Sequence, residues 1–424
     1  MVDPEHQRHF ALDVVRRLRT AGFEAYWAGG CVRDELLGRK PKDYDVATNA
    51  TPPEIRALFG NQRTLPLGAA FGVITVLGPR LAGMIEVATF RQDAEYSDGR
   101  HPDRVTFSSA REDAARRDFT INGMFFDPVD RKVIDFVGGQ ADLQNHLIRA
   151  IGSPRLRFGE DKLRMLRAVR FTAAFGFSLD VETAATVREM AHQIMVVSPE
   201  RIAMEMRRLL TESGRVQGVR LLVELGLAEA VLPEIVPRDE TSRSRAEHAQ
   251  GVLGRLQNPS FSLALAALLA QQADAAVARD VGLRWKLSNK ETDEAAWLVE
   301  HRDVLAGARL LRWSKLQPVL AHPWSESLVT LHEASSPHGP EEAAYCRELL
   351  AQPREKLDPP SLLTGDDLRM LGLQPGPKFK TILQAVRNAQ LDGEIRTKEE
   401  AVRLATEISE GGTSLASPTN ITPA

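Results

Sequence analysis

The sequence predicts an α+β protein, in which a part of mixed strands and helices is followed by an all-helical remainder. Runs rich in β-branched and aromatic residues at 71–77 and 85–90 are typical of buried strands, and residues 43–47 form a shorter candidate. Helical spacing of apolar residues over 11–22 precedes these strands. After residue 150 almost every stretch has helical spacing. Because strands and helices are segregated along the chain, we expect separate domains.

The helical remainder is divided by turn signals into many short amphipathic segments. We see no internal repeat of fixed period. Helices are predicted at 160–175, 182–195, 199–211, 216–226, 244–256, 261–278, 290–305, 340–351, 365–371, 377–390 and 397–409.

Composition restricts the class of protein. The chain has 424 residues, which suggests about two to four domains. Its net charge of −3 argues against a chain whose binding is driven by strong overall basic charge, although a local basic face is compatible with it. Two cysteines and a longest apolar run of only Leu263 to Ala270 exclude a disulfide framework, a cysteine-based metal site and a membrane span. We expect a cytoplasmic protein without a membrane partner.

A double glycine opens a helix-like segment near the N-terminus. Gly29 and Gly30 allow the backbone to approach another group closely. At the start of a helix, free N–H groups and the positive helix end point toward an anion, and Arg33 lies one turn further on. A tight turn alone explains two glycines more simply, so this pattern needs support from elsewhere.

Two aspartates supply that support. Asp43 and Asp45 are expected on one face of a short strand, where their carboxylates would repel each other unless a cation lies between them. Mg²⁺ prefers carboxylate and phosphate oxygens together. An anion-binding turn followed by a metal-binding pair is the arrangement that nucleotidyl transfer requires. The competing interpretation is a solvated acidic loop.

A second polar string is Arg116-Arg117-Asp118, followed by Asn122. The arginine side chain carries a rigid donor fork that suits phosphate, whereas Asp and Asn can bond sugar hydroxyls. A surface ion pair that leads into a strand is the alternative.

A third group lies on a predicted continuous helix over 158–171. Asp161 and Arg164 are expected as i, i+3 neighbours on its surface. A carboxylate accepts a hydrogen bond from the amine of cytosine or adenine but repels the carbonyl that uracil or guanine places there. A good base-edge pair supplies about 1–3 kcal/mol of discrimination. A simple helix salt bridge is the alternative. Since residues advance about 100° each, Arg170 lies roughly half a turn from Asp161 and cannot contact the same base.

These strings together resemble the class II tRNA nucleotidyltransferase/poly(A) polymerase family. The resemblance covers about residues 10–410. It rests most firmly on Gly29-Gly30-Cys31-Val32-Arg33-Asp34, Pro41-Lys42-Asp43-Tyr44-Asp45, Arg116-Arg117-Asp118-Phe119-Thr120-Ile121-Asn122 and Glu160-Asp161-x-x-Arg164.

The resemblance implies roles for individual residues. Asp43 and Asp45 would hold catalytic Mg²⁺, and Arg117 would act with them in catalysis. Glu86 is a candidate third carboxylate, although a strand glutamate could equally pair with an arginine. The nucleotide would be contacted by Gly29, Gly30, Arg33, Arg117, Asp118, Asn122, Asp161, Arg164, Arg167 and Arg170.

The resemblance also implies a fold and domains. A polymerase-β-like nucleotidyltransferase head of mixed sheet and helices is expected, followed by a helical neck, body and tail. The body resembles a metal-dependent phosphohydrolase region, but Ala270-Gln271-Gln272 replaces the expected His-Asp, so we predict no such activity. The expected bounds are 1–150 for the head, 151–235 for the neck, 236–355 for the body, 356–410 for the tail and 411–424 for a disordered end.

The function that the resemblance implies is addition of CMP and AMP, from CTP and ATP, to the 3′ end of tRNA. A polar segment at 90–104 resembles the flexible loop of the family, which argues mildly against a variant that stops after two cytidines. The nearest alternatives are a poly(A) polymerase and a partial A-adding or CC-adding enzyme. A catalytically dead RNA-binding relative and nucleotidyl transfer to a small molecule are less favoured. The sequence predicts no oligomeric state.

Overall fold

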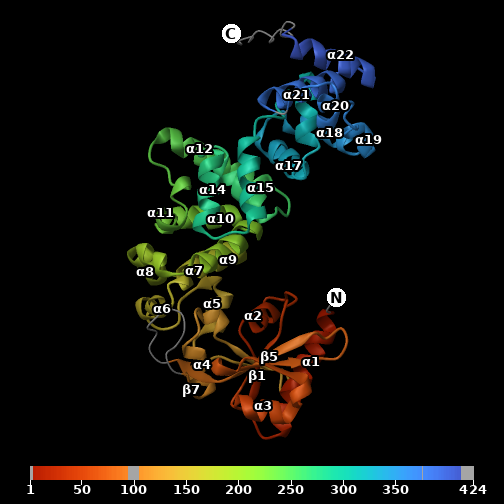
Figure 1. Cartoon of the computed structure of the whole chain (residues 1–424). Coiled ribbons are helices and arrows are strands. Elements are labelled where there is room, and N and C mark those ends of the chain that lie inside the picture. The colour runs from red at the N-terminus through yellow and green to blue at the C-terminus, as the bar shows by residue number, and fades with distance from the viewer. Residues whose placement is uncertain (1–2, 94–104, 375, 412–424) are drawn as a thin grey trace. The chain divides into compact units, whose positions relative to one another are not determined.

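The computed structural model describes residues 3–93, 105–374 and 376–411 (Figure 1). The predicted disordered end from 412 onward and most of the 90–104 loop lie outside the described residues. The chain divides into two compact units. One comprises Met1–Gln250 with Asp280–Ser288, and the other comprises Gly251–Arg279 with Asn289–Ala424.

A seven-stranded mixed sheet forms the centre of the first unit, as the sequence predicts. Its order is β3-β4-β5-β2-β1-β8-β9, and only β2 and β5 pair in parallel. The two strongest sequence patterns become the neighbouring strands β4 and β5. The strands are β1 (Ala25–Ala28), β2 (Asp45–Thr48), β3 (Thr64–Gly68), β4 (Val73–Leu77), β5 (Met84–Thr89), β8 (Phe125–Asp127) and β9 (Lys132–Ile134).

Helices cover both faces of this sheet. α1 (Pro4–Thr20) packs on β1, β2 and β5, and α3 (Pro52–Phe59) packs on β4 of the same face. α1 begins at Pro4 because the Asp3 side chain accepts hydrogen bonds from two backbone N–H groups of its first turn. On the opposite face α4 (Ala110–Ala115) adds Ala110 and Ala114 to an apolar cluster with Ala28, Ala47, Phe90 and Phe125.

The remaining elements of this unit are mostly helical, and most of them follow the sheet in the chain (Figure 1). The helices are α2 (Gly30–Leu36), α5 (Gly139–Gln144), α6 (Pro154–Glu160), α7 (Leu163–Phe175), α8 (Val181–Met190), α9 (Pro199–Thr211), α10 (Arg215–Glu224) and α11 (Leu227–Val231), and the short strands are β6 (Arg91–Asp93), β7 (Val105–Phe107), β10 (Leu147–Ile148) and β11 (Ser178–Leu179). The two-residue strands β10 and β11 pair with each other in parallel. The division between the two units falls within α12 (Glu240–Arg255) and α14 (Ala275–Arg284), so each unit contains part of both helices.

Two predicted helices are interrupted. The predicted helix at 158–171 ends as α6 and restarts as α7, because Asp161 has an extended backbone conformation with φ −144° and ψ 107°. The predicted helix at 261–278 is α13 followed by α14. Here the Asp274 carboxylate accepts a hydrogen bond of 3.0 Å from the Val277 N–H and starts the second helix.

The second unit is helical throughout its described residues. α13 is buried along its whole length, and the last helices enclose an apolar cluster of their own around Leu368, Ile382 and Val386. Within the described chain, no helix combines the length and apolar character of a membrane span. The helices are α13 (Phe261–Leu269), α15 (Asn289–Glu300), α16 (Trp313–Leu320), α17 (Ser325–Ser335), α18 (Gly339–Leu350), α19 (Arg354–Leu357), α20 (Gly365–Met370), α21 (Pro377–Leu391) and α22 (Lys398–Ser409).

Candidate active site

The double glycine forms the predicted turn into α2. Gly29 precedes the helix with φ 74° and ψ −128°, a conformation that residues with a side chain rarely adopt. A Cβ atom at Gly29 would lie only 2.9 Å from Nη1 of Arg117. Glycine is therefore required for two independent reasons, and the first and second predicted motifs meet at this point.

Arg33 joins the same two motifs. Its Nη1 donates a 2.6 Å hydrogen bond to Oδ1 of Asn122, and its Nε and Nη2 donate to Asp34. The guanidinium lies 4.5 Å from the ring centre of Phe175 in α7. Only 10% of the side chain is exposed, and its contacts with Asn122 and with Phe175 of α7 hold it in place.

The two aspartates do not share one strand, contrary to prediction. β2 begins at Asp45, so Asp43 lies in the preceding loop. Asp45 is the register partner of Glu86 in the parallel neighbour β5, and the two side chains therefore share a sheet face. This is the face of Ala47, which packs toward α4.

The electrostatics show that these carboxylates are nevertheless close. The Asp45 side chain is exposed, but the protein around it reduces the hydration of its carboxylate. Glu86 and Asp43 add negative charge nearby. These effects raise the pKa of Asp45 to about 6, against the opposing charge of Arg117. A divalent cation would relieve this repulsion, so the donor set fits a hard metal ion.

The protein supplies only part of such a metal site. Among the described residues, no group of three or more His, Cys, Asp or Glu side chains is arranged to hold a metal ion. Asp43 and Asp45 would thus depend on other oxygen ligands, such as those of a bound phosphate chain, to complete a coordination shell.

A buried aspartate that sequence reasoning missed holds the arginine string. Asp113, at 1% exposure, accepts hydrogen bonds of 3.0 and 3.2 Å from Arg117 and also pairs with Arg116. Burial would raise its pKa, but the two guanidinium charges lower it. Arg117 also lies 5.0 Å from the ring centre of Phe125. The i, i+4 spacing of Asp113 and Arg117 on a helix was a usable signal.

Asp118 is the centre of a second buried network. It accepts hydrogen bonds of 2.6 and 2.9 Å from Arg167, one of 3.1 Å from Asn122 and one of 2.8 Å from the Phe119 N–H. Burial would raise its pKa, but the charge and hydrogen bonds of Arg167 outweigh this and lower it to about 2. Asp118 is therefore firmly ionised and connects the head to α7.

The third motif has a different geometry from the one predicted. Asp161 pairs with Arg201 of α9, with Nη2 at 2.7 Å and Nη1 at 3.2 Å, and also accepts from the Leu163 N–H. Arg164 pairs instead with Glu160 at 2.6 Å. The predicted surface pair of Asp161 and Arg164 is wrong because the helix breaks between them, and Arg201 is a site residue that the sequence did not reveal.

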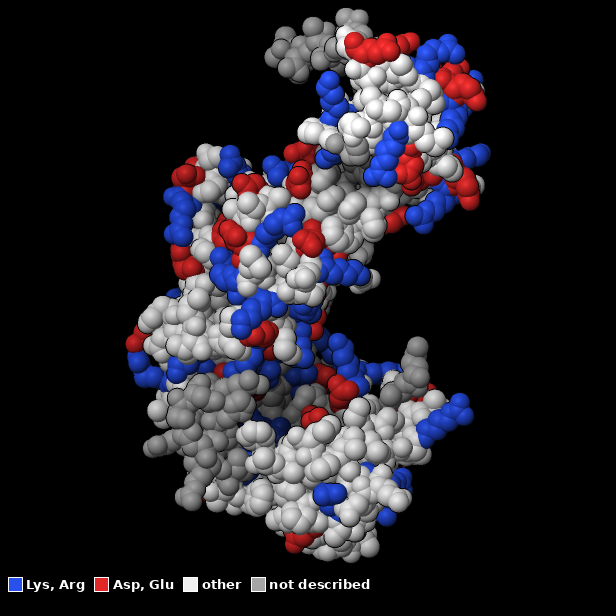
Figure 2. All heavy atoms as spheres, viewed as in Figure 1, with Lys and Arg blue, Asp and Glu red and all other residues white. Residues whose placement is uncertain are grey.

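Arg170 lies apart from these groups. It is buried and donates a 2.6 Å hydrogen bond to Glu205 of α9, another residue that the sequence did not reveal. Arg167 lies 3.7 Å from the same carboxylate. On the face shown in Figure 2, Lys and Arg side chains gather where the head meets the neck helices, with acidic side chains among them.

Comparisons with known proteins agree with this architecture. The family model "Poly A polymerase head domain" matches residues 25–149, and "Probable RNA and SrmB- binding site of polymerase A" matches residues 176–238. These matches define a polymerase-type nucleotidyltransferase, with the enzyme class that the sequence predicts.

Full-length relatives identify the family. The chain is 34% identical to the CCA-adding enzyme of Geobacillus thermodenitrificans over 396 residues, covering 92% of this chain and 95% of the relative. It is 43% identical to poly(A) polymerase I of Escherichia coli over 53% of this chain and 50% of that protein. The crystal structure of the Bacillus stearothermophilus CCA-adding enzyme in complex with CTP is similar, with a TM-score of 0.74, 29% identity and coverage of 97% and 99%. The chain belongs to the class II tRNA nucleotidyltransferase/poly(A) polymerase family, whose members generally use a divalent metal ion.

Proposed function

We propose that this chain adds CMP and AMP, from CTP and ATP, to the 3′ end of tRNA, and so builds or repairs its CCA end. The observation that carries the proposal is that Arg117 lies against Gly29 and that its charge also acts on the Asp45 carboxylate. The match to CCA-adding enzymes along nearly the whole chain supports it. The proposal also keeps the predicted cytoplasmic location, where tRNA is available as substrate.

The reaction needs positioning and charge stabilisation rather than a protein nucleophile. The 3′ hydroxyl oxygen of the RNA forms a bond to the α-phosphorus of the nucleotide, and the bond from that phosphorus to the leaving pyrophosphate breaks. We propose that Asp43 and Asp45 hold Mg²⁺, which supplies positive charge beside the reacting phosphate. Glu86, the register partner of Asp45, would share this charge.

Gly29, Gly30, Arg33 and Arg117 would contact the triphosphate. Arg117 donates from Nε and Nη2 to Asp113 and from Nη1 to the Asn122 carbonyl oxygen at 3.3 Å, which uses three of its five N–H groups and leaves two for phosphate oxygens. Asp118 is held ionised and would accept a hydrogen bond from a sugar hydroxyl, supported by Asn122.

Base selection is assigned to the neck, for which we keep the proposed bounds 151–235. Asp161 would accept a hydrogen bond from the amine of cytosine or adenine, and Arg164 would donate to a ring acceptor. Arg167 and Arg170 stay predicted nucleotide contacts. Their ion pairs with Asp118 and Glu205 favour a bracing role for both.

Poly(A) addition is the second candidate. The 43% identity to poly(A) polymerase I favours it, but that match covers only about half of each protein. The CCA-adding relative matches 95% of its own length at 34% identity, so CCA addition is the better-supported function. Addition of A alone or of CC alone shares the same motifs.

A product-length assay separates these functions. Purified protein is incubated with tRNA that lacks its CCA end, and with CTP, ATP or both. We expect addition of two C residues with CTP alone, completion by a single A when ATP is present, and little product with UTP or GTP. Long A tracts on unrelated RNA would contradict the proposal. Asp43→Ala should abolish extension while CTP binding persists, and retained extension would refute the metal assignment.

A further inference from the structure

The loop between α2 and β2 carries cations that the nucleotide site does not use. It contains Arg39, Lys40 and Lys42, and all three are exposed. Gly38, at φ 66°, ends the helix and starts the loop, and the buried ring of Pro41 fixes φ between the two lysines. The loop therefore presents its charges from a restrained backbone.

These cations differ from the arginines around the nucleotide site. The latter are each paired with a carboxylate, as in Arg117 with Asp113, Arg167 with Asp118 and Arg201 with Asp161. No ion pair joins Lys40 or Lys42 to a carboxylate in the part of the chain that the structure describes. Their positive charge is therefore available to a ligand.

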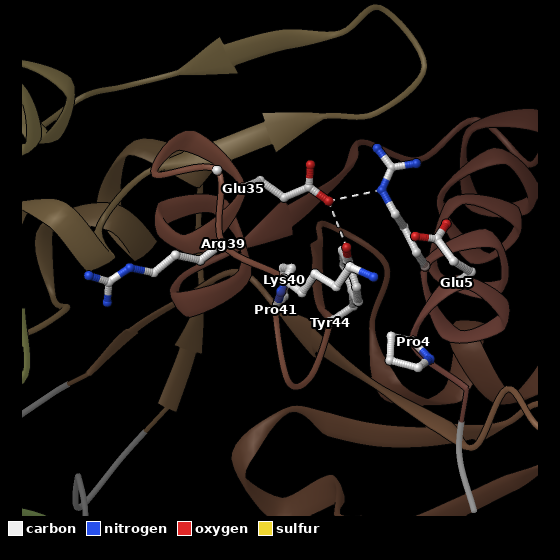
Figure 3. A pocket seen from close by; sticks show the side chains of 9 residues that line it. Pro4, Glu5, Glu35, Arg39, Lys40, Pro41 and Tyr44 are labelled. Carbon is white, nitrogen blue, oxygen red and sulfur yellow. Dashed lines mark hydrogen bonds and ion pairs between the residues drawn. The ribbon is translucent and has the colours of Figure 1, made fainter. Parts of the chain in front are cut away.

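A hollow of about 250 Å³ lies beside the loop. Figure 3 shows Glu35, Lys40 and Tyr44 around it, whereas Arg39 extends away from them. The Glu35 carboxylate is already engaged, since it accepts hydrogen bonds of 2.9 Å from Arg8 and 2.6 Å from the Tyr44 hydroxyl. Glu5, at the α1 side, forms no ion pair with Lys40 among the described residues. The hollow therefore has space for a ligand, and no ion pair among the described residues neutralises the charge of Lys40 beside it.

The place of this loop next to the reacting groups suggests its ligand. Lys42 directly precedes Asp43, and Lys40 is three residues away, which is at most about 11 Å along the backbone. A strand of a DNA duplex advances about 3.4 Å per nucleotide along the helix axis and an extended single strand advances further, so this span corresponds to at most about three nucleotides. A strand whose 3′ end lies at Asp43 and Asp45 would carry its preceding phosphates past these lysines.

Arg39 has a different contact. Its guanidinium lies 5.1 Å from the ring centre of Phe175 in α7, the ring that also contacts Arg33. Arg39 therefore attaches the loop to the neck, and its removal would disturb packing as well as charge.

We propose that Lys40 and Lys42, with the adjoining hollow, bind the backbone phosphates of the acceptor RNA immediately upstream of its 3′ end. The ligand class is RNA backbone phosphate, recognised through charge without regard to base. The loop then aligns the terminal hydroxyl with Asp43 and Asp45. This inference rests on the proposed function in taking RNA as the acceptor.

The test is equilibrium binding of a fluorescently labelled tRNA that lacks its CCA end, measured by anisotropy over a series of salt concentrations. The variant is Lys40→Ala/Lys42→Ala. The matched control is Arg63→Ala/Arg80→Ala, which removes the same charge from exposed positions before β3 and between β4 and β5. We expect about tenfold weaker binding for the lysine variant only. The slope of log K against log salt should become shallower by about 0.7–0.9 per lost phosphate contact.

The inference would be overturned if the lysine variant had the same RNA affinity and the same salt dependence of binding as the control variant. So would an unchanged RNA affinity with a raised KM for CTP, because the lysines would then serve the nucleotide. Extension of the same tRNA by the wild-type protein separates the two claims. Wild-type protein that fails to extend it refutes the proposed function, whereas normal extension with control-like binding of the lysine variant refutes only this inference.

Discussion

The carboxylate of Asp161 is held by Arg201 at 2.7 Å, across 40 residues of sequence. This ion pair orients the carboxylate oxygens of Asp161. The backbone of Asp161 is extended and lies after the end of α6. On the proposed assignment of Asp161 to base selection, selectivity would depend on a side chain in α9 that need not touch the nucleotide. We propose that Arg201 acts as a positioning residue.

Arg201→Ala should loosen base selection. Without its partner, Asp161 can turn away, and part of the roughly 1–3 kcal/mol of discrimination should be lost. We expect the ratio of kcat/KM for CTP over UTP to fall about tenfold or more. Arg188→Ala, which removes an exposed ion pair with Glu224 in the same neck, is the control and should leave the ratio unchanged. A wild-type ratio in the Arg201 variant would show that Asp161 needs no such support.

Gly29→Ala should remove activity beyond its cost in stability. The left-handed backbone costs about 1 kcal/mol, and the new Cβ would press on Arg117. Gly22→Ala is a suitable comparison, because Gly22 also has a positive φ, of 90°, but a Cβ there meets nothing within 4 Å. Thermal unfolding should show a similar loss for both, whereas turnover with CTP should fall only for Gly29→Ala. Equal turnover in the two variants would contradict the close approach of Arg117.

Asp45→Asn should stabilise the protein while it abolishes nucleotide addition. The pKa of Asp45 is raised to about 6 in the folded state, so its ionised form destabilises the folded protein. This cost is largest above pH 6, where the carboxyl is ionised. We expect a gain of about 1 kcal/mol at pH 7, less than the full shift implies because solvent screens the carboxylate. Urea unfolding measures this gain, and it should shrink as the pH falls below 6. Asp13→Asn, at an exposed site, should change little, and a loss of stability in Asp45→Asn would refute the repulsion.

Asp118, in contrast to Asp45, should stabilise the folded protein when it is ionised. Its folded-state pKa of about 2 lies below the ordinary 3.8, so the stability it adds is present above about pH 4 and is lost as the pH falls toward 2. The shift corresponds to about 2 kcal/mol. Asp118→Asn should therefore be destabilised at pH 7 by about that amount, and the difference should fall to roughly half at pH 3. A difference that does not depend on pH would show that packing, rather than charge, is responsible.

The strands β2, β4 and β5 and most of the helices after residue 150 were predictable because their signals are local. The buried runs at 73–77 and 84–89 have little polar interruption, and the glycine turn before α2 is visible from Gly29 and Gly30 alone. α16 and α17 were not predicted, and α16 contains Pro318, which argues against a helix in isolation.

The helix break at Asp161 was not predictable for a different reason. Residues around it keep helical spacing, whereas the extended Asp161 has a side chain that accepts from the Leu163 N–H and pairs with the distant Arg201. Arg170 and Glu205 likewise lie 35 residues apart. Long-range charge pairs of this kind leave no periodic trace, whereas Asp113 lay within one helical turn of Arg117 and could have been found.

The backbone carbonyl of Arg116 accepts hydrogen bonds from Arg157 at 3.2 Å and from Arg164 at 3.1 Å. The peptide that leads into Arg117 is thus tied to the helix that carries Arg164. A nucleotide that fits badly against Arg164 would disturb the alignment of its own phosphates. We therefore expect incorrect nucleotides to be penalised mainly in turnover rate and less in occupancy, so that fidelity is exercised at the moment of bond formation.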